Sequence, residues 1–86
     1  MEIIITDTAK DDIRFFLKSG QAGILKKIEK LLTAIQDSPF SGIGKPEPLK
    51  HNYSGKWSRR IDGEHRLIYS VDGELVYIYS ARGHYK

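Results

Sequence analysis

The sequence predicts an α+β domain in which two N-terminal helices pack on one face of a mostly antiparallel β-sheet, in the order β-α-α-β-β-β. Three observations predict this fold: a β-branched run at the start, two segments with a helical repeat of apolar residues, and three strand-like segments after residue 55. A length of 86 residues suits a single domain spanning 1–86.

The first two elements are expected to be a strand over residues 2–6 and a helix. The segment "EIIIT" is a β-branched apolar run, which favours a buried strand. Thr6 or Thr8 can serve as the N-cap residue of the helix, and Gly20 is suited to end it. Its expected packed face has four apolar residues at helical spacing: Ala9, Ile13, Phe16 and Leu17.

A second helix is expected to end at Asp37-Ser38-Pro39, because the residue before a proline disfavours helical geometry. Residues 40–55 are rich in glycine and proline and are expected to be loop. The apolar stripe of this helix consists of Ile24, Ile28, Leu31, Leu32 and Ile35.

Three strands are expected over residues 56–61, 64–71 and 75–82. Asp72-Gly73 is a two-residue hairpin signal, which would pair Val71 with Glu74. Period-2 alternation predicts a core face formed by His65, Leu67, Tyr69, Val71, Val76 and Ile78. The opposite, candidate functional face carries Glu64, Arg66, Ile68, Leu75, Tyr77 and Tyr79.

The hairpin between the first two of these strands has two candidate registers. A two-residue Asp62-Gly63 loop would put Trp57 on the face of Arg66. A three-residue loop over 61–63, with its glycine left-handed, would put Arg60 on that face and turn the indole toward the core. Burial of the large indole favours the three-residue loop.

Composition limits the classes of function. The net charge is +3, and residues 45–66 hold six of the basic residues against three acidic ones. Such a patch suits a polyanionic partner, although on charge alone a solvated basic face is favoured. The absence of cysteine excludes disulfides and thiolate metal sites. "MEIIITDTAK" is too short and too acidic for a signal peptide, and no apolar run reaches the length of a membrane span, so a cytoplasmic protein without membrane contact is expected.

The segment "KPEP" holds Glu47 between two prolines. Each proline fixes its own φ and disfavours helical geometry in the residue before it, so Lys45 and Glu47 are expected to be extended, and the segment cannot be a central strand. A backbone fixed in advance is what a general base requires. The alternative is a stiff surface turn whose glutamate has no role, and the segment alone favours that alternative.

Arg60, Glu64 and Arg66 are expected near the first hairpin. They can form a salt-bridged strand pair, or a phosphate clamp in which Glu64 orients the guanidinium groups. Cross-strand charge pairs are common and weak, so the two interpretations are equally favoured.

The chain ends in "ARGHYK", which places His84 and Tyr85 directly after the last strand. A histidine can act as a general acid and a tyrosine can stack on a nucleobase, although terminal residues are more often frayed. His51 and His65 are better interpreted as structural or exposed. Without cysteine or closely spaced His and Asp residues, neither a metal nor a cofactor is expected.

A base, arginines, an acid and an aromatic residue match the chemistry of RNA cleavage by the ribose 2′-OH. That reaction needs a base, a cation for the phosphorane and an acid for the leaving 5′-oxygen, and the RNA supplies the nucleophile.

The run "GKPEPLKH", followed by "SG.WSRRI..EHRLIY" and a terminal His-Tyr, closely resembles the YoeB/Txe family of bacterial toxins in the RelE-like superfamily. The resemblance covers essentially the whole chain. It implies a ribosome-dependent mRNA endoribonuclease that cuts mRNA in the A site, leaving a 2′,3′-cyclic phosphate or 3′-phosphate and a 5′-hydroxyl. It also implies a cognate antitoxin of the YefM/Phd type, and it leaves both a monomer and a homodimer open.

The resemblance assigns roles to residues of this chain. It implies that Glu47 is the general base, His84 the general acid and Arg66 the residue that stabilises the transition-state phosphate. Supporting and positioning roles are implied for Lys50, Arg60, Glu64 and Tyr85. Two departures stand at the tail: Lys86 follows the tyrosine, and Gly83, where bulkier residues are usual, is expected to loosen the segment. The alternative function is a non-catalytic RNA- or ribosome-binding module of the same fold.

Overall fold

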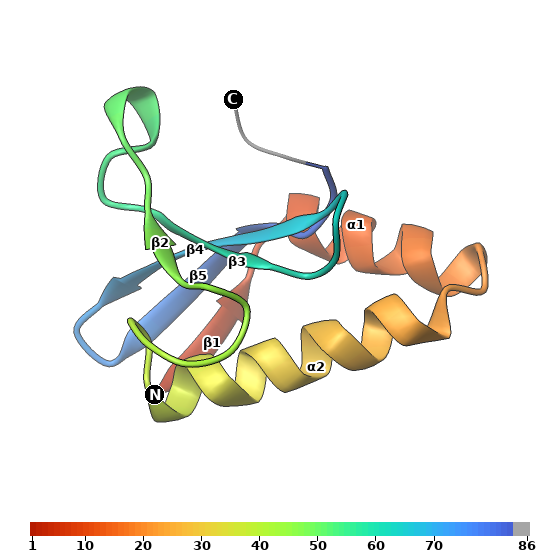
Figure 1. Cartoon of the computed structure of the whole chain (residues 1–86), viewed down its shortest axis with the longest axis horizontal. Coiled ribbons are helices and arrows are strands. Elements are labelled where there is room, and N and C mark those ends of the chain that lie inside the picture. The colour runs from red at the N-terminus through yellow and green to blue at the C-terminus, as the bar shows by residue number, and fades with distance from the viewer. Residues whose placement is uncertain (84–86) are drawn as a thin grey trace.

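A computed structural model describes residues 1–83 of the chain. Two helices lie on one face of a five-stranded sheet and leave the other face free of helices (Figure 1). The elements are β1 Glu2–Ile5, α1 Asp7–Lys18, α2 Ala22–Asp37, β2 Glu47–Pro48, the short 3₁₀ helix η1 His51–Tyr53, β3 Trp57–Arg60, β4 Arg66–Asp72 and β5 Leu75–Ser80. This is the predicted α+β fold, with β2 as an additional strand.

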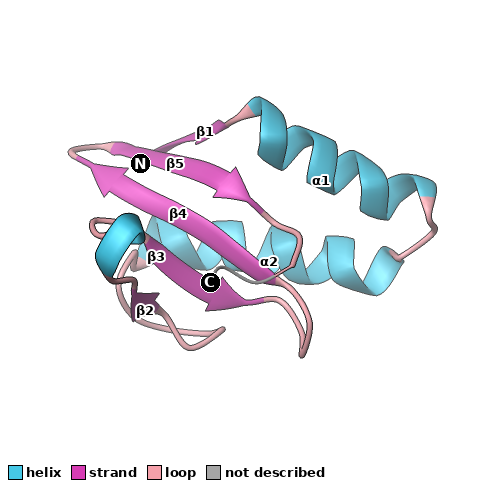
Figure 2. Ribbon diagram, turned by 90° about the horizontal axis from the view of Figure 1, so that it is seen from above, coloured by secondary structure: helices cyan, strands magenta, loops and turns pink. Residues whose placement is uncertain are grey.

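The strand order is β1-β5-β4-β3-β2, as Figure 2 shows from above. β1 runs parallel to β5, and the remaining neighbours are antiparallel. The parallel pair follows from the chain path, because the helical segment between β1 and the hairpins returns the chain to the same end of the sheet.

Of the two predicted N-cap candidates, Thr6 is the one that caps α1. Its hydroxyl accepts a hydrogen bond from the backbone N–H of Ala9 at 3.4 Å and donates to the carbonyl of Ile78 at 2.9 Å, so one side chain both starts α1 and ties it to β5. Gly20, with φ of +69°, ends α1 as predicted. The N–H of Gln21 then reaches back to the carbonyl of Phe16 at 3.0 Å, which closes the last turn of the helix.

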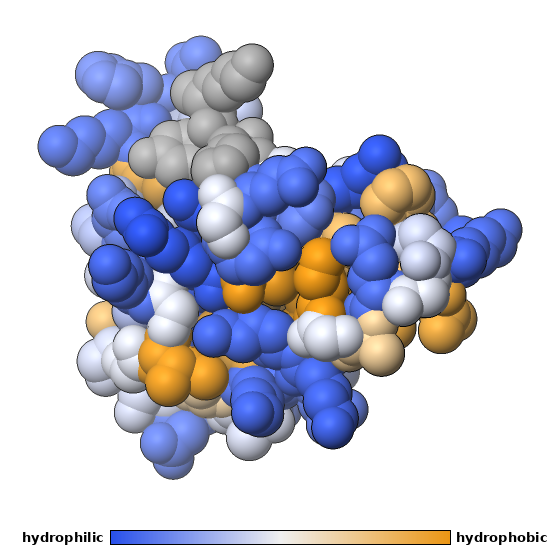
Figure 3. All heavy atoms as spheres, turned by 45° about the vertical axis from the view of Figure 1, so that its right-hand side comes forward, coloured by the Kyte–Doolittle hydropathy of each residue, from blue (hydrophilic) through white to orange (hydrophobic). Residues whose placement is uncertain are grey.

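The core lies between the helices and the sheet, with α1 and α2 packing largely through the predicted apolar stripes. The buried cluster consists of Ala9, Phe16, Ile28, Leu31, Ile35, Ile61, Leu67, Tyr69, Val76, Ile78 and Ala81. The assignment of Leu17 to the packed face was wrong, because this side chain is 66% exposed. α1 packs at one end of the sheet against β5 and α2, so its buried stripe is narrow and includes Phe16 but not Leu17. Figure 3 shows a surface that is mostly hydrophilic, with small separate apolar patches.

Both hairpins have the predicted faces but not the predicted registers. Val71 pairs with Val76 rather than Glu74, and the two-residue loop is Gly73-Glu74. Gly73 has φ of +59° at the first loop position, where a type II′ turn requires glycine. In the first hairpin the N–H of Ile61 donates to the carbonyl of His65 at 3.0 Å, so the loop is 62–64 rather than 61–63.

A slip of two residues preserves every face, because side chains alternate with a period of two. Arg60 lies opposite Arg66, and Trp57 lies opposite Tyr69. The favoured register predicted that these residues share faces, but it would have paired Arg60 with Glu64 and Trp57 with Leu67. The expected left-handed conformation at Gly63 was wrong, since its φ is not positive.

The "KPEP" segment is an edge strand, consistent with the expectation that it cannot be central. Glu47 pairs with Ser58 and Pro48 with Trp57, at the outer side of β3. The prediction that Lys45 is extended was wrong: its φ is +51°. The chain turns here because the carbonyl of Gly44 is held by the N–H of Arg60 at 2.6 Å, and the segment must leave that contact to reach the edge of the sheet.

Neither helix in the described part of the chain has the length and apolar character needed to cross a membrane.

Candidate functional site

The helix-free face of the sheet, called here the open face, brings together three of the sequence-predicted site residues. Glu47 on β2 lies opposite Ser58 on β3, and Ser58 lies opposite Ile68 on β4. Two residues further along, Arg60 lies opposite Arg66. A carboxylate and two guanidinium groups from three strands therefore share one surface, on the side of the sheet away from α2.

The two arginines differ in how they are held. The Nη1 atom of Arg66 donates to the carbonyl oxygens of Asp62 at 3.1 Å and His65 at 3.3 Å, so the hairpin loop orients this guanidinium. The side chain of Arg60 is exposed and, within residues 1–83, has no hydrogen-bond or ion-pair partner. Two like charges placed opposite each other repel, which favours a bound anion between them.

Glu64 does not form the salt-bridged strand pair with Arg60 or Arg66 that the sequence left open. It lies in the loop 62–64, and its Oε1 atom is 3.8 Å from Nε2 of His65. Its side chain is 79% exposed. Repulsion between the arginines on the open face is thus not relieved by this carboxylate.

The loop that leads to Glu47 is held by Arg59, a fully buried residue to which the sequence analysis assigned no role. Its guanidinium donates to three loop carbonyls: Ile43 at 3.0 Å, Ser38 at 2.6 Å and Ser41 at 2.8 Å. Its Nε atom donates to the hydroxyl of Tyr69 at 3.2 Å. The buried guanidinium of Arg59 therefore ties the loop that precedes "KPEP" to β3, next to Arg60.

The loop 62–64 is held by an aspartate at its first position. Oδ1 of Asp62 accepts the backbone N–H groups of Glu64 at 2.9 Å and His65 at 2.7 Å. Desolvation raises the pKa of Asp62, but these two hydrogen bonds, with the nearby positive charge of Arg66, outweigh it and leave the pKa below its ordinary value. The ionised carboxylate thus stabilises the loop from which Arg66 is oriented.

The last described residue, Gly83, is held beside Arg66. Its carbonyl accepts the backbone N–H of Arg66 at 2.9 Å, and its own N–H donates to Nδ1 of His65 at 2.9 Å. Both backbone polar groups of Gly83 are therefore hydrogen-bonded, and the expectation that this glycine loosens the residues after it stays a prediction. His84 and Tyr85, the predicted acid and positioning tyrosine, lie outside the described residues.

Lys50 lies apart from the strand pairs, exposed at the start of the η1 loop. The same side of the molecule carries an aromatic pair on β5: the rings of Tyr77 and Tyr79 stack with centroids 6.5 Å apart. Nζ of Lys56 stands 4.3 Å from the centroid of the Tyr79 ring. A bulge in the pairing of β4 with β5 leaves Tyr79 as the extra residue, and its hydroxyl bonds Oγ of Ser70 at 2.8 Å.

The sequence holds no direct signal for the role of Arg59, since its carbonyl partners lie 16 to 21 residues away along the chain. His65 was predicted to be structural or exposed, and it is buried with 7% of its surface exposed. Its contact with Gly83 spans 18 residues and depends on the hairpin register. Within residues 1–83, no three His, Asp or Glu side chains cluster as metal ligands would.

The fold and this site define the class of protein. A solved structure described as a YoeB/ParE toxin from Agrobacterium tumefaciens superposes with a TM-score of 0.94 at 39% identity, covering 99% of this chain and 100% of that one. Two helices on a five-stranded mixed sheet are the architecture of the RelE-like toxins, and this chain has that fold.

The family model described as the YoeB-like toxin of bacterial type II toxin-antitoxin system matches residues 5–85, so the chain belongs to the YoeB-like toxins. It is 46% identical over 86 residues to Toxin YoeB of Synechocystis, covering 100% of this chain and 99% of that protein. It is also similar, at 41% identity, to a YoeB–YefM complex from Staphylococcus aureus with a TM-score of 0.87 and to a YoeB dimer from the same organism with a TM-score of 0.88; each comparison covers 99% of this chain and 98% of the other.

Proposed function

We propose that this protein is an endoribonuclease that enters the A site of the bacterial ribosome and cleaves mRNA there, which stops translation. The observation that carries the proposal is the open face, where Glu47, Arg60 and Arg66 gather on three adjacent strands. Glu47 and Arg60 are exposed and, among the described residues, have no ionic partner. Unpaired charges of both signs on one rigid surface suit a phosphodiester with an adjacent hydroxyl.

In the proposed reaction, Glu47 accepts the proton of the ribose 2′-OH and the 2′-oxygen attacks the adjacent phosphorus. The P–O bond to the 5′-oxygen breaks, which leaves a 2′,3′-cyclic phosphate on one fragment and a 5′-hydroxyl on the other. The rigid edge strand β2 supports this role, because a base that is fixed before binding loses little entropy in the transition state.

The negative charge that develops on the phosphorane is stabilised by Arg66, with Arg60 and Lys50 as further cations. The hydrogen bonds from Arg66 to the carbonyls of Asp62 and His65 support this assignment, since they orient the guanidinium before substrate arrives. Glu64, beside His65 in the same loop, is assigned a supporting role. His84 is proposed to protonate the leaving 5′-oxygen, and Tyr85 to position the nucleotide by stacking.

Two protein partners are proposed: an antitoxin that covers the open face, and a second copy of this chain. We propose an antitoxin of the YefM type as the inhibitory partner, because the related Staphylococcus aureus toxin is solved in complex with YefM. A segment that carries acidic side chains across the open face would neutralise its arginines and exclude RNA. The YoeB dimer from that organism supports a homodimer as a second assembly.

The test uses purified ribosomes stalled on a defined mRNA, with cut sites mapped by primer extension. The wild type is expected to cut within the A-site codon. Arg66→Ala and Glu47→Ala are expected to slow the cut by about 10²- to 10³-fold, the range for a lost charge stabiliser or general base. The loss for Glu47→Ala is partial if the ribosome or solvent accepts the 2′ proton.

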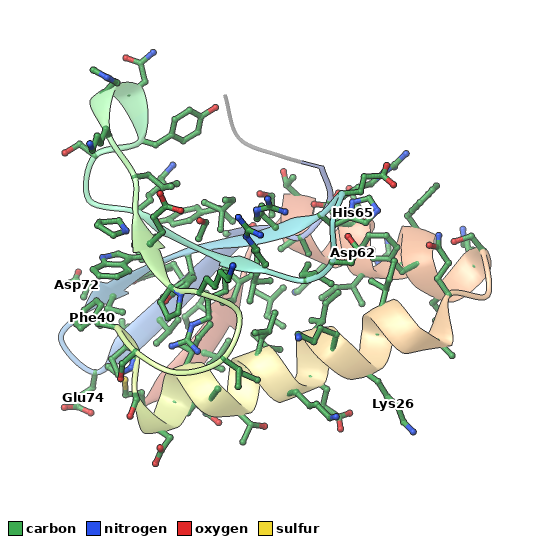
Figure 4. The ribbon with its side chains drawn as sticks, viewed as in Figure 1. Lys26, Phe40, Asp62, His65, Asp72 and Glu74 are labelled. Atoms are coloured by element: carbon green, nitrogen blue, oxygen red, sulfur yellow. The ribbon has the colours of Figure 1, made fainter. Side chains whose placement is uncertain are left out.

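The matched control is Lys26→Ala, because Lys26 lies on α2 and points away from the sheet (Figure 4). It changes the net charge by the same amount as Arg66→Ala and is expected to cut at the wild-type rate. If the wild type binds ribosomes and leaves the mRNA intact, the protein is a non-catalytic binding module and the proposed reaction is wrong.

A further inference from the structure

The segment that leaves β5 is anchored by a buried imidazole. Gly83 donates its N–H to Nδ1 of His65 at 2.9 Å, and its carbonyl accepts the N–H of Arg66 at 2.9 Å. His65 thus holds the residue directly before His84, from a position adjacent to the phosphate-binding Arg66. Figure 4 shows His65 and Asp62 together at the hairpin end where the chain leaves the sheet.

The imidazole is held on several sides. Its ring meets that of Phe16 on α1 edge to face, with centroids 5.0 Å apart. Its backbone N–H is bonded to Oδ1 of Asp62 at 2.7 Å, and its carbonyl accepts from Ile61 at 3.0 Å. With 7% of its surface exposed, His65 has little freedom to move, so a bond to its Nδ1 fixes Gly83 relative to the core.

Gly83 has φ of +76°, a conformation that other residues adopt only with strain. A glycine at this position is therefore required by the direction in which the chain turns at the anchor. Hydrogen bonds to both its N–H and its carbonyl, together with this φ, fix the point from which residue 84 continues.

We propose that His65 is a positioning residue: its neutral imidazole anchors Gly83 and thereby sets the start of the segment that delivers the general acid His84. This inference rests on the proposed function for its catalytic consequence, but not for the anchor itself. A bond from the Gly83 N–H requires a lone pair on Nδ1, so the ring must be neutral with its proton on Nε2. Glu64, whose Oε1 is 3.8 Å from Nε2, favours that tautomer.

Protonation of His65 would place an N–H donor on Nδ1, facing the N–H of Gly83, and break the anchor. The charged groups beside His65 are Glu64 and Asp62 from the loop and Arg66 on β4. Asp12 of α1 accepts the N–H of Ala81, two residues before Gly83, at 2.9 Å. A protonated ring is therefore expected to lose its bond to the Gly83 N–H.

The first test follows the Gly83 amide by ¹⁵N NMR on the full chain, without RNA. In the wild type its chemical shift should titrate together with the His65 ring, and its hydrogen exchange should accelerate as the ring protonates. His65→Phe, which keeps the packing on Phe16 but has no acceptor, should give a fast-exchanging amide at every pH. His65→Asn, whose Oδ1 can accept the same bond, should restore protection and remove the titration.

The second test measures cleavage on stalled ribosomes with two synthetic mRNAs, one normal and one with sulfur in place of the leaving 5′-oxygen. A thiolate leaves without protonation, so it needs no general acid. His65→Phe is expected to lose on the order of 10- to 100-fold on the normal mRNA and little on the sulfur mRNA, as His84→Ala should. His65→Asn should retain most of the wild-type rate. Ile35→Val, a core change near the C-terminal end of α2, controls for general destabilisation.

Two outcomes would overturn the inference: a Gly83 amide that does not follow His65, or a His65→Phe rate that falls equally on both mRNAs. If the wild type cuts neither mRNA, the proposed function fails, and the NMR titration still decides the anchor.

Discussion

At the scale of single residues, two neighbouring arginines on β3 have opposite environments, one buried and one exposed. Arg59 points into the protein, where three loop carbonyls and the Tyr69 hydroxyl surround its guanidinium. Arg60 points to the open face and is exposed. The alternation of the strand alone places one of them in the interior and the other on the open face, where we propose that it binds phosphate.

Substitution of the two arginines by lysine should separate these roles. Arg59→Lys is expected to lower the free energy of unfolding by about 3 kcal/mol, because one ammonium cannot satisfy acceptors arranged around a planar guanidinium. Arg60→Lys, the matched control, should change it by less than about 0.5 kcal/mol. Urea denaturation followed by circular dichroism measures both. Equal losses for the two variants would contradict the carbonyl cage.

Tyr69 is expected to lower the stability of the folded protein in alkaline solution. Burial raises its pKa above the ordinary value of 10.0, although the hydrogen bond and charge of Arg59 act against that rise. The folded state therefore holds the phenol proton more tightly than the unfolded state does. This contribution to stability is complete below pH 10 and is lost as the pH rises from there through the folded pKa.

Tyr69→Phe should reduce the fall in the free energy of unfolding above pH 10, because phenylalanine has no proton to lose. At neutral pH the same variant should lose about 1–3 kcal/mol, because the carbonyl of Pro39 loses its donor at 2.6 Å and Arg59 loses an acceptor. Urea titrations at pH 7 and at several values above 10 measure both effects. A variant as alkali-sensitive as the wild type would assign the loss to another group.

At the scale of elements, the joint between α2, the loop 38–44 and β3 depends on one glycine. Gly44 has φ of +83°, and a Cβ there would stand 2.8 Å from Cδ2 of Leu31 and 3.1 Å from Cβ of Arg59. Its carbonyl binds the N–H of Arg60 at 2.6 Å. A side chain at this position would separate the loop from the strand that carries the site.

Gly44→Ala is expected to cost more than about 2 kcal/mol, from backbone strain together with the clash on Leu31. Gly73→Ala is the control, because Gly73 also has positive φ, of +59°, but a Cβ at that residue would meet no atom within 4 Å. It should cost about 1 kcal/mol, the strain alone. Thermal unfolding of the two variants measures the difference, and equal costs would show that the packing at Gly44 is unimportant.

The loop 62–64 should give the protein a sensitivity to acid. Because the pKa of Asp62 is lowered in the folded state, its stabilising effect is present above the unfolded value near 3.8 and is lost as the pH falls through the folded pKa. Asp62→Asn is expected to reduce the decline of the melting temperature below about pH 4, since its amide does not titrate. An unchanged decline would assign acid sensitivity to other carboxylates.

The hairpins show how far sequence predicts elements. The pattern of apolar residues predicted which side chains share a face, and those faces are confirmed for Leu67, Tyr69, Val76 and Ile78. The registers were each wrong by two residues, because the pattern repeats every two residues and is unchanged by such a slip. The loops decide between the remaining registers, through the Asp62 carboxylate and the left-handed Gly73.

At the scale of the whole molecule, the helices cover one face of the sheet and leave the other face free (Figure 2). Arg60 and Arg66 lie opposite each other on that open face. A net charge of +3 is modest, so binding of RNA should depend on where the cations lie rather than on their total. Lys50, Arg60 and Arg66 supply three phosphate contacts in the proposed complex.

The affinity for a short labelled single-stranded RNA should therefore fall with salt with a slope of about −2 in log K against log [salt], three contacts at about 0.7 each. Arg60→Ala should reduce the slope by about 0.7, whereas Lys26→Ala should leave it unchanged. Fluorescence anisotropy at several salt concentrations measures the slopes. A similar loss in both variants would mean that RNA binds by diffuse charge and not on the open face.

The sequence by itself determined the two helices, the caps of α1 and the end of α2, the faces of the hairpin strands and the resemblance that assigned Glu47 and Arg66. These features depend on the spacing of residues close together in the chain, which can be read directly from the sequence. Only the tertiary structure decided the hairpin registers, the carbonyl cage of Arg59 and the bond from Gly83 to His65. Each of these joins residues distant in the chain, and its geometry exists only after the sheet has brought them within hydrogen-bond distance.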